Sequence, residues 1–431
     1  MDFQSNGIFQ NLEKILKKYY LCDYCLGRLV AQILTKLSNK DRGKIIRNFF
    51  AILVDAGEIE IKKENLYGIN LRFRKVEMDK KPVCFICKNF LDDENLTKKA
   101  QEIMQKIKGI EFDTFLIGSI PTDEMRRNEE KIWEIFGADY AESIKSDINR
   151  EIGKIISRKL KKKLDRKNPD LTIIIDLKNN QIRKQIKSLY VFGYYQKLVR
   201  GIPQATWYCP YCHGKGCVKC KGTGLLYPTS VQMIIEKPFL KATKGKKSKF
   251  HASGREDIDA RCLAWRPFVI EIVKPLKRKI SLRKIQREIN KSKKVKVKGL
   301  KFVEKDVVKL VKNERSAKTY LVDVIFEKEI PKEKLKELKK LENRVIYQKT
   351  PLRVIRRRVN KLRKRRVFKI SWKIVSKKRV IFRIKTEAGL YVKELIHGDG
   401  GRTKPSFYDI LKVKPRKILL DVIKIESNLK V

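Results

Sequence analysis

Three carboxylates stand close together in a chain that is otherwise strongly basic. They are Glu256, Asp257 and Asp259, in the string SGREDIDARCLAWRPFVIEI (253–272), where arginines flank them and a β-rich run follows. An ionised carboxylate can act as a nucleophile, as a base or as an electrostatic stabiliser, and nearby cations keep it ionised even when it is buried. A salt-bridged surface loop is the alternative, because exposed charges commonly pair in this way. The string alone supports both interpretations.

Eight of the nine cysteines are arranged as CxxC pairs. Two intervening residues let both sulfurs of a pair bind one tetrahedral zinc ion at about 2.3 Å. The string CPYCHGKGCVKCKGTG (209–224) brings two pairs together and resembles the zinc-binding repeat of DnaJ-type co-chaperones. We expect one structural zinc there and a second one shared by the two upstream pairs; buried thiols or a redox dithiol are the alternatives. The predicted metal ligands are Cys22, Cys25, Cys84, Cys87, Cys209, Cys212, Cys217 and Cys220. Because four thiolates complete the coordination of zinc, neither site should be catalytic.

A third group of residues is rich in arginine. The string YQKTPLRVIRRRVNKLRKRRVF (347–368) contains no carboxylate, so its cations have no partners within the string. A solvated charged helix is the alternative, but a polyanion such as RNA is the better partner for such a run. The glycine-rich string GDGGRT (398–403) could help to bind a phosphate, and a purely structural turn is the alternative. The predicted substrate-binding residues are Arg255, Tyr347, Arg353, Arg356, Arg357, Arg358 and Arg402.

The composition agrees with a folded, multidomain protein that binds nucleic acid. The chain has 431 residues, with 103 Lys and Arg against 49 Asp and Glu, a formal charge of +54 and 42% apolar residues. No apolar run approaches the roughly 20 residues of a membrane-spanning helix, and the first residues lack a signal-peptide core. Cysteines without a secretory signal favour metal binding over disulfides. We therefore expect a cytoplasmic protein with no membrane partner.

Hydrophobic periodicity indicates which elements must position these groups. Apolar residues at helical spacing predict helices within 9–56 and over 144–160, and the charged segment 332–343 predicts a surface helix. The Asn179-Asn180 pair predicts a turn between two strands. The predicted strands are 171–177, 181–186, 268–275, 319–326, 367–375 and 379–387. The Cys-rich string separates the two halves of the chain, and we expect the main boundary there.

Three strings together resemble one enzyme family. Gly-Arg-x-Asp before a strand, as in GREDIDAR, is similar to the signature of pseudouridine synthases, and YQKTPLRV and EAGLYVKELIHGDGGRTKPS resemble further motifs of these enzymes. The chain is thereby identified as a member of the archaeal and eukaryotic tRNA pseudouridine-54/55 synthases, the tenth pseudouridine synthase family. The resemblance implies that Asp257 is the single catalytic residue, with Asp259 as the alternative. It also implies that Tyr391 stacks on the target base, unless that ring is part of the core. Lys393 would pair with the catalytic Asp, at a position where the bacterial enzyme has Arg.

The same resemblance implies an α+β architecture. An N-terminal zinc-containing accessory region with a THUMP α/β unit would precede a C-terminal pseudouridine synthase domain, built on a mixed, mostly antiparallel sheet with flanking helices. The expected parts are a helical zinc-binding module (1–95), a THUMP-like RNA-binding unit (96–205), a Cys-rich zinc segment (206–226) and the catalytic domain (227–431).

The implied activity is the isomerisation of uridine to pseudouridine in tRNA, expected at positions 54 and 55 of the TΨC arm. Catalysis would need neither a metal nor a nucleotide cofactor; tRNA is the expected partner, and the sequence identifies no protein partner. Whether the carboxylate attacks the sugar or acts as a base stays open. The alternative function is a non-catalytic, zinc-containing RNA-binding or RNA-chaperone protein. THUMP units also accompany methyltransferases, thiolation enzymes and deaminases, but the motifs of those enzymes are missing from this sequence.

Overall fold

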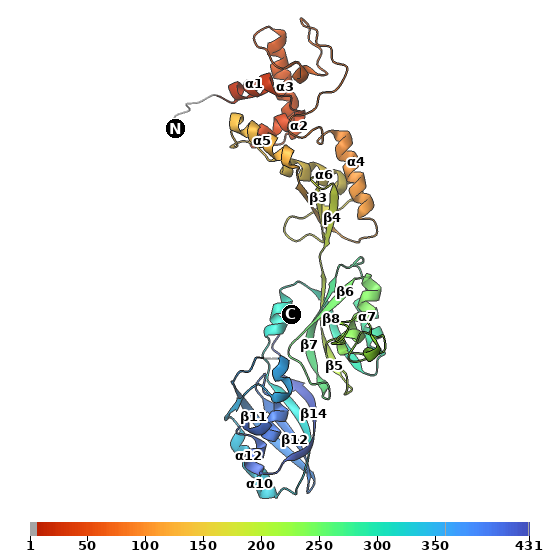
Figure 1. Cartoon of the computed structure of the whole chain (residues 1–431), viewed down its shortest axis with the longest axis vertical. Coiled ribbons are helices and arrows are strands. Elements are labelled where there is room, and N and C mark those ends of the chain that lie inside the picture. The colour runs from red at the N-terminus through yellow and green to blue at the C-terminus, as the bar shows by residue number, and fades with distance from the viewer. Residues whose placement is uncertain (1–6, 358, 430) are drawn as a thin grey trace. The chain divides into compact units, whose positions relative to one another are not determined.

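The computed structural model describes residues 7–357, 359–429 and 431, and it divides into two compact units, Met1–Lys187 and Ser188–Val431 (Figure 1). The described helices include none that is both long enough and apolar enough to cross a membrane.

The first unit begins with a helical part. Its elements are α1 (Ile8–Lys18), α2 (Asp23–Gly27), the 3₁₀ turn η1 (Arg28–Val30), α3 (Asn39–Asp55) and the 3₁₀ turn η2 (Lys63–Leu66). Ser38 begins α3 as its N-cap, because its hydroxyl accepts a hydrogen bond from the Asp41 amide. In the apolar stripe of α1, Leu12, Ile15 and Leu16 are buried, as their spacing predicts, whereas Phe9 at its start is 40% exposed.

A four-stranded mixed sheet completes the first unit. The elements are α4 (Asp93–Lys106), β1 (Thr114–Ile120), α5 (Asp123–Phe136), α6 (Ile144–Leu160), β2 (Lys163–Leu164), β3 (Leu171–Asp176) and β4 (Gln181–Ile186). The strand order is β2-β1-β3-β4, and the predicted turn joins β3 to β4, with Asn180 at a φ of 47°. One continuous core includes Phe50, Leu96, Ile148 and Ile173, so the helical part and the sheet pack as a single body.

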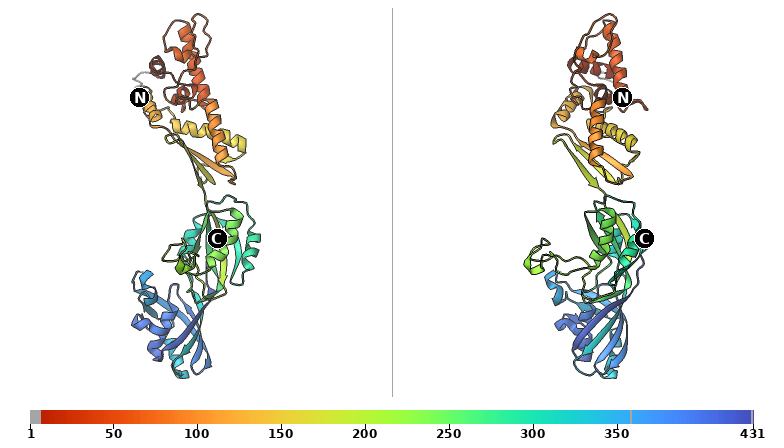
Figure 2. Two further views of the ribbon diagram at one scale, coloured as in Figure 1. Left: turned by 45° about the vertical axis from the view of Figure 1, so that its right-hand side comes forward. Right: turned by 90° about the vertical axis from the view of Figure 1, so that its right-hand side faces the viewer.

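The second unit (Figures 1 and 2) is built on a sheet of ten strands. Nine of them follow the order β13-β10-β11-β12-β9-β14-β7-β5-β8, and the tenth, β6, pairs with β7. All strand pairs of this sheet are antiparallel except β7 with β14, so the expected mixed, mostly antiparallel sheet is confirmed. The strands are β5 (Leu189–Lys197), β6 (Lys247–Ala252), β7 (Arg261–Val273), β8 (Val295–Val303), β9 (Lys318–Phe326), β10 (Val345–Gln348), β11 (Arg363–Ser376), β12 (Arg379–Thr386), β13 (Thr403–Lys404) and β14 (Pro415–Ile425). The helices and 3₁₀ turns are η3 (Val218–Cys220), α7 (Val231–Thr243), α8 (Leu282–Asn290), α9 (Val307–Asn313), α10 (Lys332–Glu337), η4 (Leu338–Leu341), η5 (Leu352–Arg357), α11 (Val392–His397), η6 (Gly398–Gly401) and α12 (Phe407–Leu411).

The large sheet carries two main cores. In one, β5, β7 and β8 pack against α7 and α8; in the other, β9, β11 and β12 pack against α10, α11 and α12. The two halves of this large sheet meet where β7 runs briefly parallel to β14, with Arg261 opposite Asp421 and Cys262 opposite Val422. The GREDIDAR motif, which carries the three predicted carboxylates, ends at Arg261, so the topology places this motif at the junction.

The boundary between the units differs from the expectation. We expected the main boundary at the Cys-rich string 209–224, but the units divide between Lys187 and Ser188. This prediction was wrong because β5 is a mostly buried strand that pairs with both β7 and β8. The Cys-rich string is instead an insertion between β5 and α7, and it forms a small lobe at the side of the second unit (Figure 2).

Candidate active site and metal centres

The loop between β6 and β7 carries the three predicted carboxylates, and the first of them is an internal anchor. Glu256 is buried; its carboxylate pairs with the guanidinium of Arg266 at 3.1 Å and accepts a 3.1 Å hydrogen bond from the Tyr195 hydroxyl. Burial raises the pKa of Tyr195 well above its usual value, so that hydroxyl remains a donor. Asp257, one residue later, instead lines a cleft.

A buried lysine holds the backbone of the same loop. Lys197, the last residue of β5, donates to the carbonyl oxygens of Ile202 at 2.7 Å and of Asp257 and Ile258 at 3.0 Å each. Burial lowers the pKa of Lys197, but the three carbonyls match the three donors of its ammonium group. The backbone that presents the Asp257 carboxylate is therefore fixed from inside the sheet.

Two cations from distant strings converge on Asp257. The guanidinium of Arg353 lies 2.9 Å from one carboxylate oxygen, and the ammonium of Lys393 lies 3.8 Å from the other. Lys393 is closer to Asp259, at 2.6 Å, and its charge lowers the pKa of that carboxyl against the opposing effect of burial. The cation nearer to Asp257 is therefore Arg353 rather than Lys393. Arg353 was predicted as a substrate-binding residue, and Lys393 as the partner of the catalytic Asp.

A buried carboxylate orients Arg353. Glu394, in α11, is 1% exposed and accepts a hydrogen bond of 2.6 Å from the Arg353 guanidinium. Burial alone would lower the pKa of Arg353, but the carboxylates of Glu394 and Asp257 raise it above its ordinary value. The sequence did not single out Glu394, although an acid in the apolar string YVKELI, one residue after Lys393, is a signal that could have found it.

The Asp257 carboxylate borders two hollows that share several lining residues. One, of about 210 Å³, also reaches Tyr320, Tyr391 and Lys318; the other, of about 300 Å³, also reaches Trp207. An ionised carboxylate beside a small cavity with aromatic walls can act on a sugar while the cavity holds a detached base. The smaller hollow, with Asp257, Tyr320 and Tyr391 in its wall, is thus the candidate active site.

Two tyrosines line the smaller hollow. Tyr391, the predicted stacking residue, is half-buried; its backbone is held by Gln348 of the YQKTPLRV string, and the Arg363 guanidinium lies 5.9 Å from its ring centroid. Tyr320, which the sequence did not single out, is 9% exposed, and burial raises its pKa to about 12. Alternation places Tyr320 on the inward face of β9. From the sequence alone, such a position indicates a core side chain and not a cavity wall.

The remaining predicted substrate-binding residues lie at varied places. Arg255 is exposed and 5.9 Å from the ring of Trp207, while Tyr347 is 44% exposed on β10. Arg402 donates to the Thr350 carbonyl and to Asn360, so it braces the loop after β10. The backbones of Arg356 and Arg357 belong to η5, and Arg358 lies outside the described residues.

The first cysteine cluster lies in the core of the first unit. Cys22, Cys25, Cys84 and Cys87 are buried, and their sulfur atoms lie within 4.8 Å of one another, so the prediction that these distant pairs meet is confirmed. The fully buried Arg28 guanidinium interacts with Cys25 and ion-pairs with Glu129, yet its Nε and Nη2 atoms have no hydrogen-bond partner. A cation with orphaned N–H groups beside four sulfurs fits a negatively charged metal–thiolate group.

The second cluster forms the Cys-rich lobe. The sulfurs of Cys209, Cys212, Cys217 and Cys220 also lie within 4.8 Å of one another. Backbone amides of Gly216 and Gly224 donate to sulfurs at 3.2 Å each, an arrangement that stabilises thiolates. Both glycines have positive φ, and a Cβ on Gly216 would lie 2.7 Å from a carbonyl oxygen, so the tight turns require glycine. The donor set again fits one metal ion.

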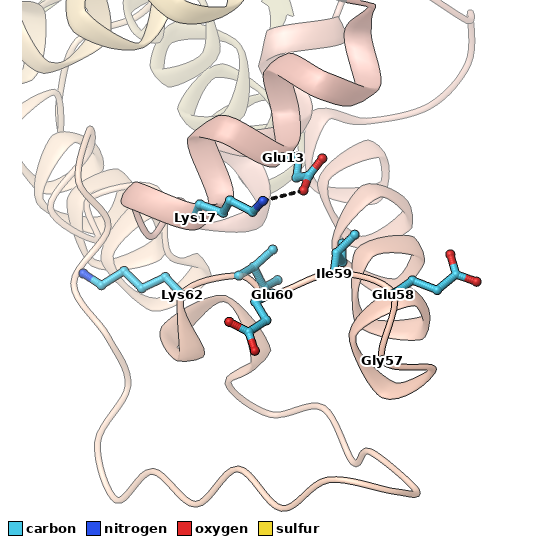
Figure 3. Close-up of a pocket in the computed structure, with 8 residues that line it drawn as sticks. Glu13, Lys17, Gly57, Glu58, Ile59, Glu60 and Lys62 are labelled. Atoms are coloured by element: carbon cyan, nitrogen blue, oxygen red, sulfur yellow. Dashed lines mark ion pairs between the residues drawn. The ribbon is translucent and has the colours of Figure 1, made fainter.

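A hollow of about 510 Å³ in the first unit does not resemble a binding site (Figure 3). Glu13 and Lys17 of α1 pair with each other at 2.7 Å, and the side chains of Glu58, Glu60 and Lys62 point in different directions. Binding sites usually present convergent polar groups on an apolar wall, which this surface lacks.

Two family models match the chain. The one described as the C-terminal part of Pus10 matches residues 190–426, and the one described as the archaeal Pus10 THUMP domain matches residues 99–176. The first match begins within β5, in agreement with the observed division between the units.

Curated relatives that carry the name tRNA pseudouridine synthase Pus10 match nearly the whole chain. The one from Methanocaldococcus jannaschii is 42% identical over 96% of this chain and 94% of its own length. The one from Methanothrix thermoacetophila is 37% identical over 97% of this chain and 94% of its own length. Among solved structures, a Cbf5–Nop10–Gar1 complex covers 53% of this chain and 47% of that chain with 16% identity and a TM-score of 0.28, too low for any conclusion about this chain.

Proposed function

Because the chain belongs to the Pus10 family of tRNA pseudouridine synthases, we propose that it isomerises uridines 54 and 55 of the TΨC arm through one catalytic aspartate, Asp257. The observation that carries this proposal is the position of the Asp257 carboxylate, 2.9 Å from the Arg353 guanidinium and at the wall of a small cavity. Asp259 is the weaker candidate, because its carboxylate is more exposed and is engaged by Lys393 at 2.6 Å.

The chemistry needs no oxidant and no co-reactant. The C1′–N1 bond of uridine breaks, the base turns, and a C1′–C5 bond forms; the proton lost from C5 is balanced by the proton gained at N1. Asp257 can assist by attack on the sugar or by removal of a proton, and both routes need a negatively charged carboxylate, with which the Arg353 guanidinium forms an ion pair. Glu394 acts through Arg353, since it fixes the direction of the guanidinium.

The target uridine must leave the folded tRNA elbow to reach Asp257, at a cost of a few kcal/mol. We assign the compensating phosphate contacts to the arginine-rich string, including Arg356, Arg357 and Arg358, and to the exposed Arg255 beside Trp207. The proposal also includes a structural zinc ion in each cysteine cluster and a cytoplasmic location. Four thiolates would leave a zinc ion no open position, so the metal would stabilise the fold and take no part in the reaction.

The two tyrosines of the cavity are expected to hold the detached base. We expect Tyr320→Leu and Tyr391→Leu each to lower the single-turnover rate about 10-fold or more, because stacking on one ring contributes roughly 1–3 kcal/mol. Tyr→Phe at either position keeps the ring face and should restore most of the rate. A leucine variant with an unchanged rate would show that its ring only lines the cavity.

The proposed function is tested on tRNA transcripts. The purified chain should convert uridines 54 and 55 to pseudouridine in a transcript, as detected by chemical mapping. Transcripts in which one of these uridines is replaced by cytidine provide the matched control, since the product should disappear at that position and persist at the other. Product at other positions, or no product in any tRNA, would contradict the proposal.

A further inference from the structure

Lys318 lies on the buried face of β9, where the neighbouring side chains belong to the core. It begins β9, in which Lys318, Tyr320, Val322, Val324 and Phe326 alternate onto the inward face and are all buried. Lys318 is 7% exposed. An ammonium group at such a position is costly, because burial favours its loss of charge.

The Lys318 ammonium group has no ion-pair partner among the described residues, although the more distant Glu314 carboxylate acts on it and raises its pKa. The ammonium donates to the Ser316 carbonyl at 3.0 Å, and no carboxylate of the described residues lies within ion-pair distance of it. The neighbouring cation is Arg266, whose own charge is matched by Glu256. Burial, together with the Arg266 charge, lowers the pKa of Lys318 to about 8. Two of the three ammonium donors therefore remain for a ligand.

The cavity supplies the place for that ligand. Lys318 lines the hollow of about 210 Å³ together with Asp257, Tyr320 and Tyr391. A hollow of this size can accommodate one nucleobase. We propose that Lys318 donates a hydrogen bond to a carbonyl oxygen of the everted uracil and stabilises the negative charge on the detached base.

This inference rests on the proposed function and adds a residue that acts on the base, whereas Asp257 acts on the sugar. When the C1′–N1 bond breaks, its electron pair stays with the base, and the charge spreads from N1 to the carbonyl oxygens. Asp257 acts at the sugar, whereas Lys318 acts at the base. A fixed cation in a buried cavity stabilises such charge far more strongly than a cation in water.

The first test is Lys318→Met, which keeps the length of the side chain without its charge. At saturating tRNA, the single-turnover rate should fall at least 100-fold, about the loss caused by removal of one oxyanion donor. The dissociation constant for tRNA should change less than twofold. The melting temperature of the second unit should rise by about 2 °C or more, because the variant removes a buried charge that lacks an ion-pair partner. The control Lys373→Met, at an exposed position of β11, should leave all three quantities unchanged.

A second test uses pH, because Lys318 must carry its proton to donate. The wild-type rate should decline as pH rises through about 8, and Lys318→Arg, which stays charged, should flatten this decline. The neighbouring groups titrate elsewhere: burial raises the pKa of Cys262 to about 11 and that of Tyr320 to about 12. The groups that face Lys318 are Arg266 and Cys262 from β7, Glu314 from the turn before β9, Tyr320 from β9 itself, and Asp257 from the catalytic loop.

The outcomes separate this inference from the proposed function. If Asp257→Asn is inactive and Lys318→Met reacts within threefold of the wild type, the inference fails and the proposed function stands. If Lys318→Met weakens tRNA binding, lowers its salt dependence and reacts normally at saturation, the lysine binds a phosphate and the inference is overturned. A lower melting temperature together with an unchanged pH profile in Lys318→Arg would also overturn it, since the lysine would then only support the fold.

Discussion

Replacement of Cys25 by serine is expected to unfold the first unit and to leave the second unit folded. Cys25 is completely buried in the cluster with Cys22, Cys84 and Cys87, and this cluster belongs to the continuous core of the first unit. Binding of a structural zinc contributes roughly 10–16 kcal/mol in small zinc domains, which matches or exceeds the net stability of a typical domain. Without the metal, the Arg28 guanidinium would also remain buried beside uncharged thiols.

The measurement combines metal analysis with thermal unfolding of the full chain. Wild-type protein should contain two zinc ions, and Cys25→Ser should contain one and lose the unfolding transition of the first unit. Cys262→Ser is the matched control, because Cys262 is buried but lies outside both clusters. Wild-type protein without zinc, or a Cys25→Ser variant that keeps both zinc ions and both transitions, would contradict the assignment.

Local patterns in the sequence predicted most of the elements. The strings 171–177, 319–326 and 379–387 are rich in β-branched and other apolar residues, and they are strands in the structure, as β3, β9 and β12. Their patterns are reliable because one face of each strand must be buried. The CxxC spacing likewise identified all eight cysteines that the structure gathers into two clusters.

Features that depend on contacts between distant strings could not be predicted in the same way. Strand β5 belongs to the second unit only because β7 and β8 pair with it, and nothing within its own string shows those pairings. The approach of Arg353 to Asp257 depends on Glu394, so three strings from different parts of the chain must fold before the ion pair exists. The burial of Lys318 could not be predicted, because a lysine at the start of a strand normally indicates a solvent-exposed end.

Asp257→Asn is expected to abolish pseudouridine formation and to leave tRNA binding intact. The substitution keeps the size of the side chain and removes the charge that both possible routes require. Loss of a nucleophile or base in well-studied enzymes lowers the rate by about 10⁴- to 10⁶-fold. The cleft should keep its shape, because Glu394 still holds Arg353 and Lys197 still holds the loop backbone.

Asp259→Asn is the matched control, because it removes a neighbouring carboxylate of the same loop. This variant frees Lys393 from its 2.6 Å ion pair, and we expect the rate to change less than about tenfold. A larger loss in Asp259→Asn than in Asp257→Asn would reverse the roles of the two residues.

The central claim is that the carboxylate of Asp257 performs the reaction on an everted uridine of the tRNA elbow. The most direct measurement is the amount of pseudouridine that each variant forms in one tRNA transcript during a single turnover, with the dissociation constant measured in parallel. The account predicts no detectable product from Asp257→Asn, with tRNA bound as tightly as by the wild type. Product from Asp257→Asn at a rate close to that of the wild type would contradict it.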